Sequence, residues 1–335
     1  MSEQTQPGRA RPEAIKAVPV RHPGRWVAIA VIAILGAMFL HLLVTNDRFR
    51  WSFIFTSYAE GKRGVMFTGP VLQGLWGTIL LTISSMVIGI VLGIVLAIMR
   101  LSENPVLKYA SWVYTWFFRA VPRLVLVILF GNLNILWTRI GFGLPFDKQI
   151  GALFGIDNFN GQFYSIKATD LLAGFVAGML ALGLSEAAYM AEIVRAGIQS
   201  IDPGQGEAAV ALGLSRTQVL LRVVLPQAMR VIVPPTGNEV IAMVKDTSLV
   251  AFAPVTFELF FQLSAIKART FVVLPVLIAA VIWYLIMCSI LMVGQFFLER
   301  HFGRGYGTAA KAKRRLRNIE MEQGGRITVE GGATP

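Results

Sequence analysis

The sequence predicts an all-α membrane protein, a polytopic helical bundle of about six transmembrane helices. Of its 335 residues, 55% are hydrophobic and only 15% are charged, whereas soluble domains average about 45–50% apolar and about 25% charged residues. The apolar residues lie in long blocks rather than in the periodic stripes of a soluble amphipathic helix. A membrane helix needs about 20 mostly apolar residues to cross a hydrocarbon core of about 30 Å. Composition and block length together indicate a chain that folds in a lipid bilayer.

The first apolar block, 26–44, predicts an extra N-terminal transmembrane helix. It follows a basic tail, 1–25, that has no apolar run. A cleaved signal peptide has a shorter apolar core and a small-residue cleavage site close behind it. This block is long enough to span the bilayer and lacks such a site, so we expect it to be retained as a membrane helix.

Five further blocks predict the main transmembrane domain, over 74–300. They lie at 77–99, about 112–137, 171–190, about 231–252 and 271–297. The second block is interrupted by Arg119, Pro122 and Arg123, so we expect its first part along the membrane interface and its crossing from Leu124. The loops 46–70 and 139–170 are expected to be spacers on the outer side. A second basic tail, 301–335, follows the last block.

The net charge of +12 indicates topology rather than nucleic-acid binding. With the N-terminus inside, most of the 31 Lys and Arg residues fall in the inside segments, among them Arg119 and Arg123. This bias follows the positive-inside rule. We therefore expect a bacterial inner-membrane protein with both termini in the cytoplasm, in contact with membrane lipid and not with nucleic acid.

The polar loop between the fourth and fifth spans, 197–228, has the signals of two short helices. Asp202 is a good N-cap, Pro203 suits the first helical position, and Gln205 is placed to reach back to the cap. That helix is expected to run to about Leu212 and to end at Gly213, in the left-handed conformation. A second capping box, 215–218, opens a helix that runs toward Leu225-Pro226.

This loop admits two interpretations. Its helix–turn–helix pattern resembles a bacterial DNA reader, which would make the chain a membrane-tethered regulator. However, the second helix offers only a few polar side chains (Arg216, Thr217, Gln218 and Arg222), and both ends of the loop are tethered to membrane spans. A secondary carrier or channel for amino acids is a further alternative.

The second interpretation rests on a family resemblance. Glu207-Ala208-Ala209, then Gly213, then Leu225-Pro226 resemble the EAA loop of ATP-binding-cassette (ABC) importer permeases, with Val223 in place of the usual Ile. The strings AYMAEIVR (188–195), GQ (204–205), LPQA (225–228) and KDTSL (245–249) resemble the branch that takes up polar amino acids, such as histidine, glutamine, glutamate and arginine permeases. The resemblance covers about 75–297 and leaves the first span and both tails outside.

The resemblance implies a five-helix permease core that dimerises with a second permease subunit, identical or paralogous. The EAA loop would then dock on a cytoplasmic ABC ATPase dimer through Glu207, Ala208, Ala209 and Gly213, while Leu225 and Pro226 fix where the loop rejoins the next span. An extracytoplasmic amino-acid-binding protein would deliver a polar or charged amino acid. The chain has no Gly-x-x-x-x-Gly-Lys-Ser/Thr phosphate loop. We therefore expect no cofactor in this chain and no catalysis by it, with ATP and Mg held by the partner.

Polar residues inside the later spans are candidates for the substrate pathway, because ionisable groups in a membrane are costly. The candidates are Ser185, Glu186, Tyr189, Asn238, Glu239, Lys245, Asp246, Thr247 and Ser248. Pro234-Pro235 and the polar cluster Lys245–Ser248 predict an interrupted fifth span. The alternative roles are structural: Lys245 and Asp246 would neutralise each other, and Glu192 would pair locally with Arg195.

Two positions qualify the resemblance. Glu186 stands where the family has a small or amide residue, which puts a simple transfer of substrate identity in doubt. Arg119 and Pro122 match the ends of the family's Arg-Gly-Thr-Pro stretch and are carried over as structural candidates. The single cysteine, Cys288, and the scattered His22, His41 and His301 predict neither an intrachain disulfide nor a metal site.

Overall fold

The computed structural model describes residues 23–59, 61–136, 138–156, 159–171, 173–253 and 255–302. Nearly all of the two predicted basic tails, and His22, lie outside these ranges. The chain divides into two compact units, 1–50 and 51–335. The first contains α1 (Pro23–Thr45) and a short 3-10 turn, η1 (Asp47–Phe49). Helix α1 confirms the predicted span at 26–44, and its apolar side chains are exposed, as a lipid-facing helix requires.

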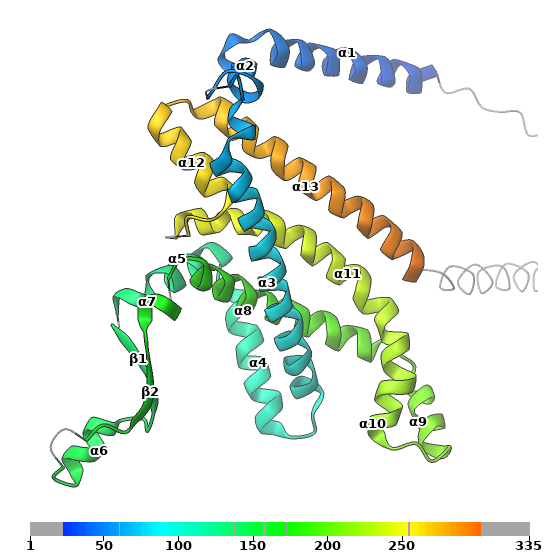
Figure 1. The fold of residues 1–335 in the computed structure, drawn as a ribbon. Helices are drawn as coiled ribbons and strands as arrows, with labels where there is room; N and C mark the ends of the chain where they lie inside the picture. Colours follow the sequence, from blue (N-terminus) through cyan, green and yellow to red (C-terminus); the bar gives the residue numbers. More distant parts are fainter. Residues whose placement is uncertain are drawn as a thin grey trace, which may run out of the picture. The chain divides into compact units, whose positions relative to one another are not determined.

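The second unit is a bundle of long helices (Figure 1). Across the described residues, five helices are long and apolar enough to cross a membrane, or six if one bent pair counts as a single span. Besides α1 they are α3 (Gly69–Leu101), α8 (Gly174–Gln199), the stretch Arg216–Phe252 and α13 (Val273–Phe302). These helices cover the predicted blocks at 77–99, 171–190, 231–252 and 271–297, with ends that differ from the predicted bounds. The predicted fold class is therefore confirmed.

The bent pair confirms the predicted interruption of the second block at Arg119, Pro122 and Arg123. Helix α4 (Pro105–Ala120) packs along α3, with the Ser111 hydroxyl donating to the Leu96 carbonyl at 2.8 Å. The Tyr114 hydroxyl likewise donates to the Leu184 carbonyl of α8. The chain then turns by 100° into α5 (Arg123–Asn132). Pro122 marks the turn because proline disfavours helix at the residue before it.

The close pairing of α3 with α8 depends on small residues. On α3, four of them recur every fourth residue, from Ser85 to Ala97, and all are buried. A Cβ added to Gly89 would lie 2.6 Å from Cγ of Glu186, and one added to Gly93 would lie 2.5 Å from Cβ of Met190. Both distances are too short for real atoms. Glycine is therefore required for the two backbones to approach this closely, as small residues allow in membrane helices generally.

The polar loop folds as predicted in its first half. Helix α9 (Pro203–Ala211) is capped by Asp202, whose side chain accepts from the Gly204 amide, and Gly213 has a φ of +85°. The predicted capping box is formed at Ser215 and Gln218, where α10 (Arg216–Val219) begins. The cap contact assigned to Gln205 differs, since its backbone amide donates to the Asp202 carbonyl instead.

In the second half of the loop the predicted helix runs to Leu225-Pro226 and continues past it. A π-helical turn, η4 (Leu220–Val224), carries α10 without a break into α11 (Leu225–Asp246). Pro226 lacks an amide hydrogen and its ring crowds the preceding turn. A wider π turn just before it accommodates both effects, as such turns do at irregular points in helices.

The fifth span is interrupted, but not at its prolines. Pro234 and Pro235 lie inside the continuous α11, and the change comes at Thr247, where a 3-10 segment, η5 (Thr247–Phe252), begins. The Pro234 carbonyl accepts a hydrogen bond from the Gln295 amide of α13 at 2.8 Å. This contact is one of the ways in which neighbouring helices satisfy backbone groups around a membrane proline.

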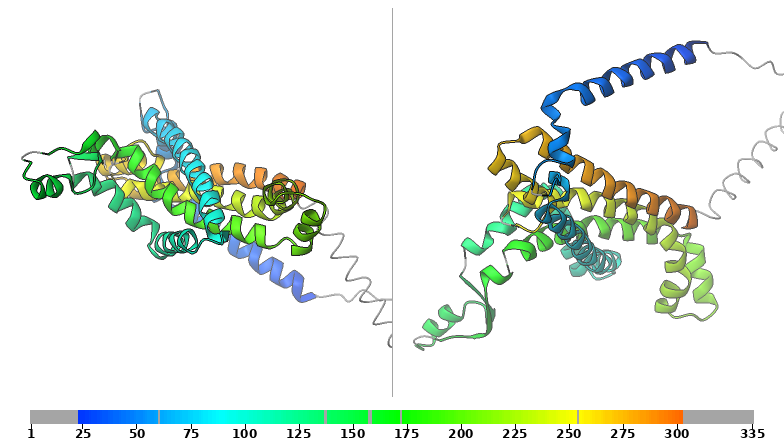
Figure 2. Two further views of the ribbon diagram at one scale, coloured as in Figure 1. Left: turned by 90° about the horizontal axis from the view of Figure 1, so that it is seen from below. Right: turned by 45° about the horizontal axis from the view of Figure 1, so that its top comes forward.

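Several outer elements were not predicted. They are α2 (Trp51–Phe55), η2 (Val65–Phe67), η3 (Leu133–Ile135), α6 (Asp147–Leu153), α7 (Ala168–Leu171) and α12 (Leu259–Thr270). The 139–170 segment is not a plain spacer. It contains an antiparallel hairpin of β1 (Arg139–Gly143) and β2 (Gln162–Lys167), with α6 between the strands. The hairpin projects away from the helices of its unit (Figure 2).

Candidate functional site

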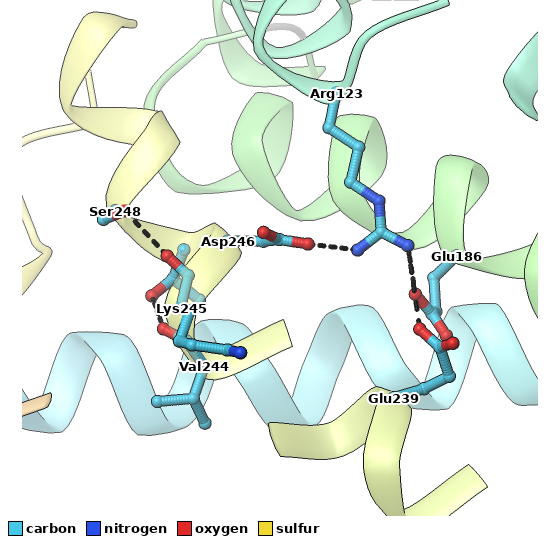
Figure 3. Close-up of polar contacts among 8 residues, drawn as sticks. Arg123, Glu186, Glu239, Val244, Lys245, Asp246 and Ser248 are labelled. Carbon is cyan, nitrogen blue, oxygen red and sulfur yellow. Dashed lines mark hydrogen bonds and ion pairs between the residues drawn. The ribbon is translucent and has the colours of Figure 1, made fainter. Parts of the chain in front are cut away.

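The main polar site is a cluster of charged side chains around Arg123, where α5 meets α8 and α11 (Figure 3). One terminal nitrogen of Arg123, Nη2, lies 2.9 Å from Oε2 of Glu186, and the other, Nη1, pairs with Asp246. Nη2 also lies 3.9 Å from Oε2 of Glu239. We refer to these four residues together with Tyr189 as the Arg123 cluster.

The backbone explains why these side chains meet. Arg123 is the first residue of α5, directly after the bend at Pro122, so its side chain leaves the bend toward the neighbouring helices. Glu186 and Tyr189 are three residues apart on α8 and share a face. Glu239 and Asp246 are seven apart on α11, two helical turns, and also share a face. A cation at a helix N-terminus is unfavourable by itself, and the three carboxyl groups compensate for it.

Tyr189 supplies an aromatic face to the cluster. The guanidinium carbon of Arg123 lies 4.6 Å from the centre of the Tyr189 ring, and that of Arg119 lies at 5.6 Å. Both are within the range of a cation–π contact, about 6 Å. The ring therefore favours positive charge at this point in the bundle.

The side chains of the cluster range from fully buried to partly exposed. Glu186 is fully buried, whereas the side chains of Arg123, Glu239 and Asp246 are 14%, 26% and 30% exposed. Among the described residues, Oε1 of Glu186 and Oγ of the adjacent Ser185 are buried without a hydrogen-bond partner. The site thus has unused hydrogen-bonding capacity that a ligand with donor groups would satisfy.

Four of the nine predicted pathway residues belong to the cluster: Glu186, Tyr189, Glu239 and Asp246. Ser185 is buried beside it. Asn238 and Lys245 are exposed, seven residues apart on another face of α11. The hydroxyls of Thr247 and Ser248 donate to backbone carbonyls of the preceding turn, those of Val244 and Lys245. These two hydroxyls therefore stabilise the start of η5.

The structure also decides between the structural alternatives. Asp246 pairs with Arg123, so the expected neutralisation by Lys245 is wrong. The local pair of Glu192 with Arg195 is confirmed, with Nη2 to Oε2 at 2.6 Å. Within the described ranges, no group of three or more His, Cys, Asp or Glu side chains is arranged to hold a metal ion.

Arg123 is the residue that the sequence prediction missed. The basic-residue pattern predicts a cytoplasmic position for Arg123, whereas its partners in the structure lie on α8 and α11 of the bundle. The signal was present: a charged residue directly after a proline, in an otherwise apolar stretch. Such a residue in a membrane segment indicates a functional site with a partner.

The α9–α10 loop offers a second site. Glu207 and Ala208 are exposed on α9, whereas Ala209 is buried, so the two alanines do not share a face. Val210 and Leu212 are also exposed, Leu212 by 81%. A shallow groove of about 630 Å³ is lined by Pro203, Gly206, Glu207, Val210, Ala211, Arg216 and Val219. Leu225 and Pro226 begin α11 and lie outside this lining.

Comparison with known proteins identifies the family. Residues 89–304 match the family described as binding-protein-dependent transport system inner membrane component. The chain belongs to this family. It is 40% identical over 324 residues to the arginine transport system permease protein ArgU of Corynebacterium glutamicum, an alignment that spans 96% of this chain and 94% of that protein.

Further relatives agree. The probable glutamine ABC transporter permease protein GlnM of Bacillus subtilis is 30% identical over 235 residues, spanning 70% of this chain and 94% of that protein. A crystal structure of an amino acid ABC transporter with histidines is 31% identical, with a TM-score of 0.54, and spans 71% of this chain and 96% of its own.

The predicted permease subunit of an ABC importer is thus confirmed, and the amino-acid branch of the family is supported by these relatives. The chain is a transporter subunit rather than an enzyme and a multi-pass inner-membrane protein. A carrier or channel that works alone and a DNA-binding regulator are not favoured.

Proposed function

We propose that this permease imports a cationic amino acid, with arginine as the first candidate, and that the substrate passes the Arg123 cluster. The observation that carries the proposal is the meeting of three carboxyl groups and one aromatic ring at a partly open point between helices. The relative that aligns with almost the whole chain is named as an arginine permease, which supports the same substrate class.

The chemistry of the cluster matches such a substrate. A cationic amino acid carries a side-chain cation and an α-ammonium group, and both need acceptors when water is removed. Carboxyl groups supply charge-assisted hydrogen bonds, which are stronger than neutral ones. The Tyr189 ring adds a face that attracts cations, while Arg119, whose guanidinium carbon lies 5.6 Å from the centre of that ring, is placed to attract the substrate α-carboxylate. Neutral amino acids use fewer of these groups.

The exposed face of the α9–α10 loop is the proposed contact with a cytoplasmic ATPase. Glu207 offers a charge, and Val210 and Leu212 offer apolar side chains that water does not favour. The loop joins α8 to α11, and these two helices carry all three carboxyl groups of the cluster. A push on the loop is therefore transmitted to both helices. ATP and Mg would be bound by the ATPase dimer, and this chain would bind no cofactor.

The remaining parts of the proposed assembly follow from the family. They are a second permease subunit, identical or paralogous, and an extracytoplasmic amino-acid-binding protein. Both termini are placed in the cytoplasm, on the side of the α9–α10 loop. The bias of basic residues supports this orientation even without Arg119 and Arg123, which the structure places beside Tyr189.

The substrate assignment is tested by uptake in proteoliposomes that contain the permease, its ATPase and its binding protein. We expect ATP-dependent uptake of L-arginine that excess L-lysine inhibits more strongly than L-glutamine does. Glu186→Gln is expected to lower uptake at least about tenfold, equivalent to about 1.4 kcal/mol of transition-state stabilisation. Glu192→Gln is the matched control, because Glu192 lies on the same helix and pairs locally with Arg195. Normal arginine uptake by Glu186→Gln would refute the assignment.

The docking assignment has its own test. Glu207→Lys and Gly213→Arg should leave the protein inserted in the membrane but abolish ATP-dependent uptake. Lys148→Glu, a charge reversal of the same size and opposite sign to Glu207→Lys, lies on the hairpin segment 139–167 and should leave uptake intact. Normal coupled uptake in both loop variants would remove α9 from the ATPase interface.

A further inference from the structure

We propose that Arg123 is an internal substitute for the substrate, a tethered guanidinium that occupies the cation position of the pathway until a cationic amino acid displaces it. We call this arrangement the Arg123 latch. The inference rests on the proposed function, since it assigns the Arg123 cluster to a cationic substrate, and it adds how the empty site is kept closed.

The contacts of Arg123 are those of a bound guanidinium ligand. Its two terminal nitrogens reach carboxyl groups from two different helices, Glu186 of α8 and Asp246 of α11. Its guanidinium carbon lies 4.6 Å from the centre of the Tyr189 ring. Paired carboxyl groups and an aromatic face are the features that favour arginine over other cations in recognition sites. A free arginine side chain would therefore make the same contacts.

The cluster has more acceptor groups than one guanidinium uses. Three carboxyl groups face Arg123, and the Nη2–Oε2 separation of 3.9 Å to Glu239 is longer than a hydrogen bond. In the described part of the chain, Oε1 of Glu186 and the Ser185 hydroxyl are buried without partners. Leaving buried polar atoms unpaired costs free energy. A substrate that brings additional donors can form hydrogen bonds with the acceptor atoms that Arg123 leaves unpaired. This gain in free energy favours exchange of the Arg123 guanidinium for the substrate.

The position of Arg123 connects the exchange to the moving parts. It ties α5 to α8 and α11, and these two helices are the ones that enter and leave the α9–α10 loop. Arg123 itself lies directly after the 100° bend between α4 and α5. When substrate takes over the carboxyl groups, α5 loses its ion pairs to both helices. The latch therefore holds these three helices together only while the pathway lacks its cation.

The test is equilibrium binding of radiolabelled L-arginine to the full permease chain in lipid nanodiscs. Removing a competing occupant increases the apparent affinity by the reciprocal of the fraction of sites that the occupant had left free, which is about tenfold when it blocks about nine-tenths of them. Arg123→Ala should therefore bind L-arginine about tenfold more tightly than the unmodified chain. Methylguanidinium should weaken arginine binding in Arg123→Ala, where it can refill the vacated position, and have little effect on the unmodified chain.

Two further variants keep the outcome interpretable. Arg123→Met removes the guanidinium but keeps most of the side-chain length that packs between the helices, so it should also bind L-arginine more tightly if Arg123→Ala alone fails to fold. Unchanged or weaker arginine binding in the folded variants would overturn the latch. Glu186→Gln distinguishes failure of the latch from failure of the proposed function. If Glu186→Gln binds L-arginine more weakly but Arg123→Ala does not bind it more tightly, the substrate pathway through the cluster stands and the latch is rejected. No measurable binding in the unmodified chain and Arg123→Ala alike would overturn both.

Discussion

Glu258, fully buried at the start of α12, accepts a hydrogen bond from the hydroxyl of Thr78 on α3 at 2.9 Å, although 180 residues separate the two. The other carboxyl oxygen of Glu258 caps α12 by accepting from the amides of Phe260 and Phe261. The Tyr284 hydroxyl of α13 donates to the same oxygen as Thr78. One side chain therefore connects α3, α12 and α13, and four donors replace the water that a buried carboxyl group would otherwise need.

Glu258 is expected to be a major contributor to stability. Replacing it with alanine leaves the Thr78 and Tyr284 hydroxyls and two backbone amides without their acceptor, which should cost about 3 kcal/mol or more. The loss would appear as a clearly lower melting temperature of the detergent-purified protein. Glu103→Gln is the control, because its pair with Arg216 is almost fully exposed and should contribute less than about 1 kcal/mol. Equal melting temperatures for the two variants would show that the network around Glu258 is not stabilising.

The contact between α3 and α8 gives a second prediction. Gly93→Leu should destabilise the protein, because even a Cβ at this position would lie 2.5 Å from Cβ of Met190. Overpacking of this kind costs about 1–3 kcal/mol. Gly294→Ala on α13 is the opposite case, since nothing lies within 4 Å of its added Cβ, and alanine favours helix over glycine by up to about 1 kcal/mol. Thermal melting of both variants should therefore shift in opposite directions, and a shift in the same direction would contradict the packing argument.

Local chemistry explains what the sequence predicted well. The Asp202 cap, the Gly213 turn and the Ser215–Gln218 capping box each depend on residues within four positions of one another, so a reader of the sequence sees the whole interaction. The apolar blocks are equally local. These signals were sufficient for the spans and for the first helix of the polar loop.

The missed features depend on contacts between distant segments. Arg123 meets Glu186 and Asp246 only because α5 turns back on the bundle, and no spacing along the chain encodes that turn. Glu258 was overlooked for the same reason. The hairpin is different: Ile140 and Phe142 alternate with small residues in β1, and Tyr164 and Ile166 alternate in β2, which is the period-two signal of paired strands. The hairpin therefore has a local signal in the sequence, unlike the Arg123 and Glu258 contacts.

The turn at Gly213 leads to a third prediction, which depends on backbone conformation rather than on steric contact with neighbouring atoms. An added Cβ would meet nothing within 4 Å, but the φ of +85° is one that only glycine, and to a lesser degree asparagine, adopts readily. Gly213→Val should therefore distort the α9–α10 loop and reduce ATP-dependent uptake, while Gly213→Asn should retain most of it. Limited proteolysis of the loop would report the distortion directly. Equal uptake by the two variants would show that the left-handed turn is not needed for coupling.

The ring of Tyr189 gives the last prediction, which separates its aromatic face from its hydroxyl. If the ring acts by attracting cations, Tyr189→Phe should import L-arginine almost normally, since phenylalanine keeps a negative face of similar size. Tyr189→Leu keeps the bulk and removes the face, and a contact of about 1–2 kcal/mol should then appear as a roughly tenfold loss of uptake at low arginine concentration. Protein levels and melting temperatures should be similar for the two variants, because both side chains are apolar and of comparable length. A hydroxyl role predicts a different pattern, in which phenylalanine is as poor as leucine. Equal losses in both variants would therefore reject the cation–π role and assign the function to the phenol oxygen.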